Sequence, residues 1–327
     1  MQRTRLGLAA DPSPFGTISE PCCHGRIAAI APTMPRMRIA GLYRAPAAPV
    51  FSFEFFPPKT PAGWRTLYRT IADLAELRPA FVSVTSHARG ENRSQTVELT
   101  TRIQSELGIT AMAHMTCAGQ TREELGATLE RLAAAGIENV MALRGDAPKD
   151  QPEWRPVPGG FSFASELAAF VKARGDFCVG GACYPETHPD APSAAADVEN
   201  LKRKLAAGAE FLITQLFLNN AHYFAFVARA RAAGITAPIV PGIMPLVSLA
   251  NLRGALKNAP NSDIPRELER ALEDAGEDKE RGLAVGVEWA TAQCKELLAR
   301  GAPGIHFLTM NHSPATRRVH ANLTGAA

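Results

Sequence analysis

A short pattern repeats along most of this chain and restricts its possible folds more than any other feature. Each repeat has an apolar segment, a polar loop, an amphipathic segment with helical spacing and a glycine. The apolar segments are eight predicted strands, at residues 50–56, 81–85, 111–117, 139–145, 177–183, 211–216, 239–243 and 304–310. Strands that alternate with helices indicate parallel pairing, and eight such units predict an α/β fold, a closed (β/α)8 TIM barrel.

The ends of the predicted helices carry recognisable signals. Thr121 and Glu124 have the spacing of a capping box, which predicts a helix from there to about Ala135. Gly136, Gly208 and Gly234 each follow an alanine-rich helical end, where glycine accepts the left-handed conformation cheaply. These signals support the division of the chain into repeated units.

A doubly wound sheet is the competing arrangement. It is disfavoured because no GxGxxG motif follows the first strand or any other strand. HExxH, P-loop and catalytic-triad signatures are also missing from the sequence, which argues against those hydrolases and against a P-loop NTPase.

The predicted barrel spans residues 47–320 as a single domain, with a short tail at 321–327. Residues 1–46 are rich in Arg, Pro and Ala and lack sustained periodicity. We favour a disordered extension, or an upstream start codon with Met34 or Met37 as the true first residue; a transit peptide is the alternative. Residues 261–301 are long and charged, and we interpret them as the final helices of the barrel plus an insertion.

Composition narrows the class of protein. A net charge of only +3 gives no nucleic-acid footprint, and no apolar run approaches the roughly 20 residues that span a membrane. The six cysteines lack CxxC spacing, which favours a reduced, cytoplasmic compartment. The sequence Cys22-Cys23-His24 is a poor chelate, so we expect no metal site.

Polar residues gather where the predicted strands end, which is where the active sites of such barrels lie. In the first strand alternate residues share a face, so Glu54 points inward with Ser52, and the phenylalanines at 51, 53 and 55 pack outward against helices. Burial favours the neutral form of a carboxyl group, so we expect a raised pKa and a general acid at Glu54. The alternative is a buried glutamate paired with an interior Arg or Lys.

Each of the other candidate site residues also has a purely structural explanation. Asp146 is either functional or a turn-forming cap, and His114 is either functional or a satisfied core histidine. Asp197, Asn200 and Lys204 share one helix face, next to Arg203. That face suits a ribose and a pyrophosphate, but a solvated charged face is the more common explanation of such a pattern.

Several motifs together identify a resemblance to the 5,10-methylenetetrahydrofolate reductase family, over roughly residues 50–315. The motifs are FSFEFFPPKT (51–60), HMTC (114–117), ALRGD (142–146), YPE (184–186), NLKRK (200–204), ITQLF (213–217), PGIMP (241–245) and HFLTMN (306–311). The resemblance implies a flavin-containing barrel that passes a hydride from NADH or NADPH to FAD. The hydride then passes to the methylene carbon of the folate, and 5-methyltetrahydrofolate is formed.

The resemblance also implies residue roles. Glu54 would be the general acid as the folate ring opens to an iminium at N5, and Asp146 would lie near the flavin and folate rings and favour that cation. Gln215, Leu249, Glu54 and Asp146 would bind the folate. The residues implied to bind FAD are Thr85, Ser86, His114, Arg144, Gly145, Asp146, Tyr184, His188, Asp197, Asn200, Arg203 and Lys204. Family members form homo-oligomers, so we expect one here.

Two positions depart from the family pattern. Ser86-His87-Ala88 stands where many members have Tyr-Gly-Ala, and Leu249 stands where some have phenylalanine. The first departure motivates an alternative in which a flavin-free reductase transfers hydride directly from the nicotinamide. A further alternative is a subunit of a larger redox complex with little activity alone.

Overall fold

The computed structural model describes residues 37–44, 48–86, 92–145, 156–257 and 259–325, all within one compact unit. Its strands are β1 (Val50–Phe55), β2 (Phe81–Val84), β3 (Ala111–Thr116), β4 (Asn139–Leu143), β5 (Cys178–Cys183), β6 (Ala209–Thr214), β7 (Ile239–Val240), β8 (Gly242–Ile243) and β9 (Gly304–Leu308). Its helices are α1 (Ile39–Leu42), α2 (Pro61–Ala75), α3 (Arg93–Leu107), α4 (Arg122–Ala134), α5 (Ala164–Arg174), α6 (Ala194–Ala206), α7 (Asn220–Ala232), α8 (Leu249–Leu256), α9 (Arg266–Ala275), α10 (Lys279–Ala299) and α11 (Pro314–Thr324).

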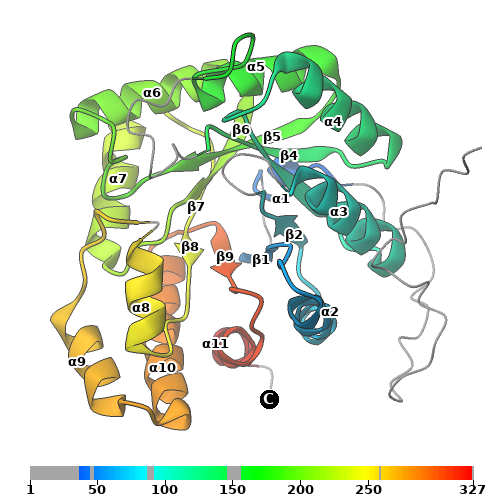
Figure 1. The fold of residues 1–327 in the computed structure, drawn as a ribbon. Helices are drawn as coiled ribbons and strands as arrows, with labels where there is room; N and C mark the ends of the chain where they lie inside the picture. Colours follow the sequence, from blue (N-terminus) through cyan, green and yellow to red (C-terminus); the bar gives the residue numbers. More distant parts are fainter. Residues whose placement is uncertain (1–36, 45–47, 87–91, 146–155, 258, 326–327) are drawn as a thin grey trace, which may run out of the picture. The chain divides into compact units, whose positions relative to one another are not determined.

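The strands form one parallel sheet in the order β7-β6-β5-β4-β3-β2-β1-β9-β8. The two ends of this order, β7 and β8, are consecutive in sequence, so the sheet returns on itself and helices surround it (Figure 1). The predicted (β/α)8 barrel is confirmed. The predicted strand at 239–243 is divided at Pro241, which has no N–H for a ladder bond but accepts one from His306 N at 3.0 Å.

The helix-end signals are confirmed as well. Thr121 and Glu124 make both hydrogen bonds of the capping box at the start of α4. Gly136, Gly208 and Gly234 all have positive φ angles, as expected of glycines that end helices.

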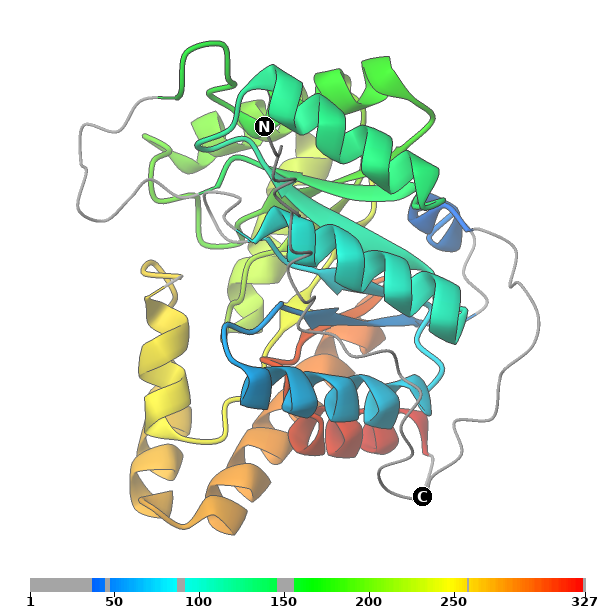
Figure 2. The same cartoon turned by 45° about the vertical axis from the view of Figure 1, so that its right-hand side comes forward.

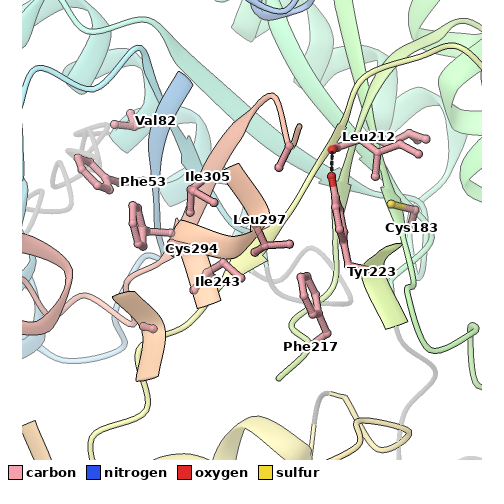
Figure 3. Close-up of a cluster of buried hydrophobic side chains, with 14 of the residues drawn as sticks. Phe53, Val82, Cys183, Leu212, Phe217, Tyr223, Ile243, Cys294, Leu297 and Ile305 are labelled. Carbon is pink, nitrogen blue, oxygen red and sulfur yellow. Dashed lines mark hydrogen bonds between the residues drawn. The ribbon is translucent and has the colours of Figure 1, made fainter. Parts of the chain in front are cut away.

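An outer apolar layer joins the strands to the helices. Phe53 and Phe55 are buried in it against α2, as the alternation in β1 predicts. Figure 3 shows part of this layer, where Tyr223 donates a hydrogen bond to the main-chain oxygen of Ile239 at 2.8 Å. Helices α2 and α11 lie side by side in Figures 1 and 2, and Ser313 donates to Asp73 between them. The outward face of β1 is therefore covered at Phe53 and Phe55, while Phe51 is partly buried.

A second apolar cluster fills the barrel interior at the N-terminal ends of the strands. Val50, Phe81, Met112 and Phe211 belong to it, together with Ile39 and other residues of the α1 region. The interior is thus largely apolar at this end, with Asn139 as a buried polar residue there, and the active sites of such barrels lie at the opposite end.

The ordered barrel exceeds the expected bounds at both ends. Helix α1 lies in the segment that we assigned to the extension, and Ile39, Ala40 and Tyr43 there are buried. At the other end, α11 continues to Thr324, where Gly325 with φ 70° ends it. The expected bounds of 47 and 320 were therefore too narrow, because short apolar helical segments at each end add to the core.

Asn139 fastens α1 to the barrel, and its loss should cost stability. It accepts a hydrogen bond from Ile39 N at 2.9 Å and donates one to Met37 O at 3.1 Å, and it is almost fully buried. Asn139→Ala leaves a buried N–H without its acceptor, so we expect the free energy of unfolding in urea to fall by about 1–3 kcal/mol. Asn251→Ala, at an exposed position in the first turn of α8, is the control and should stay within about 0.5 kcal/mol of wild type. Equal losses in both variants would contradict the fastening role.

Among the described residues, no helix combines the length and apolar character that a membrane crossing requires.

Candidate active site

A cavity of about 1410 Å3 opens at the C-terminal ends of the strands. Nearly all of the residues singled out from the sequence line it. They are Glu54, Thr85, Ser86, His114, Arg144, Gly145, Tyr184, His188, Asp197, Asn200, Arg203, Lys204 and Gln215. The fold therefore brings together residues that are spread over more than 160 positions of the sequence.

Two predicted site residues are not placed there. Asp146 lies outside the described residues. Leu249 packs against the apolar cluster of α8 and α9 that contains Leu252 and Leu268, while its neighbours Ser248 and Ala250 line the cavity. The first turn of α8 directs Leu249 toward the packed side, so the predicted substrate contact of Leu249 has no support from the structure.

Glu54 lies at the floor of the cavity with two histidines beside it. Its Oε2 atom is 3.5 Å from His114 Nε2 and 3.6 Å from His306 Nε2. Ser83 Oγ lies 3.5 Å from the same oxygen. About a fifth of the Glu54 side chain remains exposed, which leaves the carboxylate accessible from the cavity. The expected inward direction of Glu54 is thus what the structure shows.

The direction of the Glu54 pKa differs from our expectation. Burial alone raises the pKa of this carboxyl group, but the contact with His306, the charges of His114 and His306, and Ser83 outweigh burial and hold the pKa below its usual value. Burial also lowers the pKa of His114. The expected raised pKa was wrong, because the phenylalanines of β1 face outward and histidines from two other strands face inward.

The loop after β9 holds the end of β1 in place. Thr309 donates a hydrogen bond to the main-chain oxygen of Glu54 at 2.6 Å. Asn311 donates to Phe56 O at 2.7 Å and accepts from Phe56 N at 3.1 Å, in place of a paired strand. Met310 and Asn311 both have positive φ angles, a costly conformation for these residues that the surrounding hydrogen bonds maintain. This loop fixes the backbone position of Glu54.

The α6 side of the cavity is polar and cationic. Asp197 accepts a hydrogen bond from His188 N at 3.0 Å, which ties the loop after β5 to α6. Arg203 donates to Asn200 at 3.0 Å. Lys204 donates to Ala182 O at 2.5 Å, and burial lowers its pKa. The predicted shared face of α6 is confirmed, and it lines the cavity.

The loops after β4 and β5 meet at the cavity wall. Arg144 Nη2 forms an ion pair with Asp190 Oδ2 at 2.7 Å. The rings of Tyr184 and His188 meet edge to face, with centroids 4.5 Å apart. Gly145, which also lines the cavity, has φ 85°, a conformation that favours glycine over residues with a side chain.

Several residues at or below the cavity were given no role from the sequence. His306 lies beneath Glu54 and is hydrogen-bonded to the inward-facing Ser52, and alternation along β9 is the signal that could have placed it inward. Phe163 and Met310, which are 61% and 53% exposed, lie at the cavity rim. Isolated apolar residues in loops give no periodic signal, so the sequence assigned neither a role, although Met310 belongs to the HFLTMN motif.

Comparison with known proteins gives the family. A family model described as "Methylenetetrahydrofolate reductase" matches residues 42–324. The chain belongs to the methylenetetrahydrofolate reductase family. The 5,10-methylenetetrahydrofolate reductase of Escherichia coli (strain K12) is 38% identical over 266 residues, which cover 80% of this chain and 86% of that protein. Within the family the chain is also similar to "Methylenetetrahydrofolate reductase (NADH) 1" of Arabidopsis thaliana, at 37% identity over 286 residues.

The extent of the match differs between relatives in the family. The aligned region covers 84% of this chain but 48% of the Arabidopsis protein, so the chain spans about half the length of the plant relatives that it matches. A solved structure is also similar, with a TM-score of 0.61 at 14% identity, covering 85% of this chain and 95% of the other. It is an uncharacterized protein from Clostridium thermocellum that binds two copies of 5-methyl-5,6,7,8-tetrahydrofolic acid. At this identity the likeness supports the barrel fold alone.

Proposed function

We propose that this chain reduces 5,10-methylenetetrahydrofolate to 5-methyltetrahydrofolate, with reducing equivalents from NADH or NADPH that pass through bound FAD. The observation that carries the proposal is one cavity that joins Glu54, Gln215 and the α6 face, in a chain of this family. Glu54 and the basic residues of α6 line the same cavity. A reaction between a folate and a nucleotide cofactor requires both groups in one site.

The residues present fit FAD. The cavity exceeds the range of about 300–1,000 Å3 that is usual for one small ligand, so it has room for a cofactor and a substrate together. Arg203 and Lys204 would hold the phosphates by charge, and Asp197 and Asn200 would bind the polar ribose. Arg144, Gly145 and the adjacent residues Thr85, Ser86, Tyr184 and His188 would enclose the ring system. When bound, FAD supplies two-electron transfer between the nicotinamide and the folate.

Glu54 would supply the proton for the folate step. It donates from Oε2 to the ring nitrogen that leaves as the five-membered ring opens, and the substrate becomes an iminium at N5. Asp146, by its predicted role, would stabilise that cation. Gln215, which accepts a hydrogen bond from Leu216 N at 2.8 Å, would hold the folate with its amide.

The visible spectrum of the purified protein, before and after anaerobic NADH, tests the proposal. We expect a yellow protein that bleaches with NADH and regains its colour when methylenetetrahydrofolate is added. A colourless protein that takes up no added FAD but still reduces the folate would replace the proposal with direct hydride transfer. A yellow protein that never reoxidises with the folate would contradict the folate reaction and favour the partner-subunit alternative.

Three finer features belong to the proposal. We infer a cytoplasmic enzyme, supported by four free, buried cysteines among the described residues. We infer a homo-oligomer from the family alone. The choice between NADH and NADPH is to be decided by comparing the rates of bleaching with each.

A further inference from the structure

Two imidazoles converge on one carboxylate oxygen beneath the cavity. His114 on β3 and His306 on β9 lie on opposite sides of Glu54, and each presents Nε2 to Glu54 Oε2, at 3.5 Å and 3.6 Å. Within the described part of the chain, His114 Nε2 has no hydrogen-bond partner that would draw it elsewhere. The carboxylate is therefore the polar group toward which both rings are directed.

The ring of His306 has one fixed orientation. Its Nδ1 atom is 2.7 Å from Ser52 Oγ, and its Nε2 atom is 3.2 Å from Ser83 Oγ. The ring is fully buried and stacks on Phe81, with centroids 5.7 Å apart and an angle of 13° between the planes. Because Ser52 takes up Nδ1, the Nε2 atom is left to exchange a proton with Ser83 and Glu54.

The groups around Glu54 favour its ionised form, so Glu54 is not the natural holder of a proton by itself. An isolated buried carboxyl group would stay protonated, but the histidines reverse that preference and favour the carboxylate. The described titratable groups that face Glu54 are His114 from β3 and His306 from β9, while β2 contributes only the hydroxyl of Ser83. A proton that enters this cluster is thus shared among three groups.

We propose that Glu54, His114 and His306 form one proton-holding array, in which His306 is a positioning residue that returns the proton to Glu54. The inference rests on the proposed function of Glu54. Before each turnover the array holds one proton, with Glu54 as a carboxylate and His306 protonated on both ring nitrogens. His306 Nε2 passes its proton to Glu54 Oε2, directly or through Ser83, and the ring becomes neutral with its remaining proton on Nδ1 beside Ser52. Glu54 Oε2 then gives that proton to the leaving nitrogen of the folate and returns to the carboxylate, and water in the cavity restores one proton to the array.

His306 acts in this array without touching the substrate. It is fully buried, and the cavity is lined by Glu54 and His114 above it. We expect His306→Gln to slow the folate half-reaction by about 10- to 100-fold, a range typical of residues that orient a functional ligand. The pH dependence of that half-reaction should change, while reduction of the flavin by NADH should keep its rate.

His320→Gln is the matched control. His320 is a buried histidine on α11 that packs edge to face on Phe51, outside the barrel interior, with centroids 4.9 Å apart. We expect this variant to keep the wild-type rate and pH profile. A His306→Gln enzyme with the wild-type rate and pH profile would overturn the proposal.

A second measurement tests the array even if the His306→Gln protein does not fold. The imidazole 15N signals of the whole protein are followed through a pH titration in wild type and in Glu54→Gln. We expect two buried histidines to titrate together in wild type and to shift in Glu54→Gln, while His320 does not change. If the signals of these two histidines are the same in wild type and in Glu54→Gln, the proposed array is contradicted. A wild type that fails to reduce the folate but shows coupled signals would instead count against the proposed function.

Discussion

Glutamine in place of Glu54 should lower the rate of folate reduction by about 10²- to 10⁴-fold, the usual contribution of a positioned general acid. The substitution keeps the size of the side chain but replaces one carboxyl oxygen with an amide NH2 group, and so removes the transferable proton. Oxidation of NADH by a quinone acceptor should continue near the wild-type rate, because that half-reaction requires no proton from the cavity floor. Stopped-flow absorbance of the flavin separates the two half-reactions.

Glu186→Gln is the control for this substitution. Glu186 is half-buried and accepts a hydrogen bond from Asp263 N at 2.7 Å, in a loop beside the cavity. We expect both half-reactions of this variant to resemble those of wild type. If Glu54→Gln instead lost both half-reactions, Glu54 would be a structural residue of the barrel interior.

Loss of the Lys204 charge should weaken FAD binding by about 10- to 100-fold, because a hydrogen bond to a charged group contributes about 1.5–3 kcal/mol. Lys204 runs along β5, where a side chain at Gly181 would lie 2.6 Å from the Lys204 stem. The glycine therefore makes room for the lysine to reach the cavity. Its ammonium group has a carbonyl acceptor at Ala182, and a phosphate would add the opposite charge.

Lys202→Met gives a matched comparison with Lys204→Met on the same helix. Lys202 is exposed and forms an ion pair with Glu199 at 3.0 Å, away from the cavity lining. Fluorescence titration of the flavin-depleted proteins with FAD should show wild-type affinity for Lys202→Met and weakened affinity for Lys204→Met. Equal affinities in the two variants would remove Lys204 from the phosphate site.

The barrel and much of the site could be predicted because their signals are local. The alternation of strand, helix and glycine can be recognised within each repeat, and so can the ends of the strands where functional residues gather. The division of the seventh strand at Pro241 is also a local effect. Which strands pair on each side of it is not local, because β7 pairs with β6 and β8 pairs with β9. The α1 segment was missed because four helical residues are too short to show periodicity.

The surroundings of Glu54 could not be predicted from β1 alone. The pKa of a buried carboxyl group depends on which charges face it, and those charges come from β3 and β9. Apolar neighbours in the sequence pointed to the wrong direction of the shift, since Phe53 and Phe55 lie on the other side of the strand. The direction of Leu249 could not be predicted for a similar reason, because sequence position does not fix which side of a short helix faces the cavity, and its contact with the substrate stays a prediction.

The hydrogen bonds between the loop after β9 and the end of β1 also determine when the site is completed during synthesis. Glu54 belongs to the first strand that leaves the ribosome, but the residues that hold its backbone follow 255 positions later. Contacts at such separation form late, because a long segment of chain must first be ordered. A nascent or partly unfolded chain in which β9 is undocked therefore has no complete acid site. Enzymatic activity would accordingly report the closure of the whole barrel, and recovery of activity should be the last event observed on refolding.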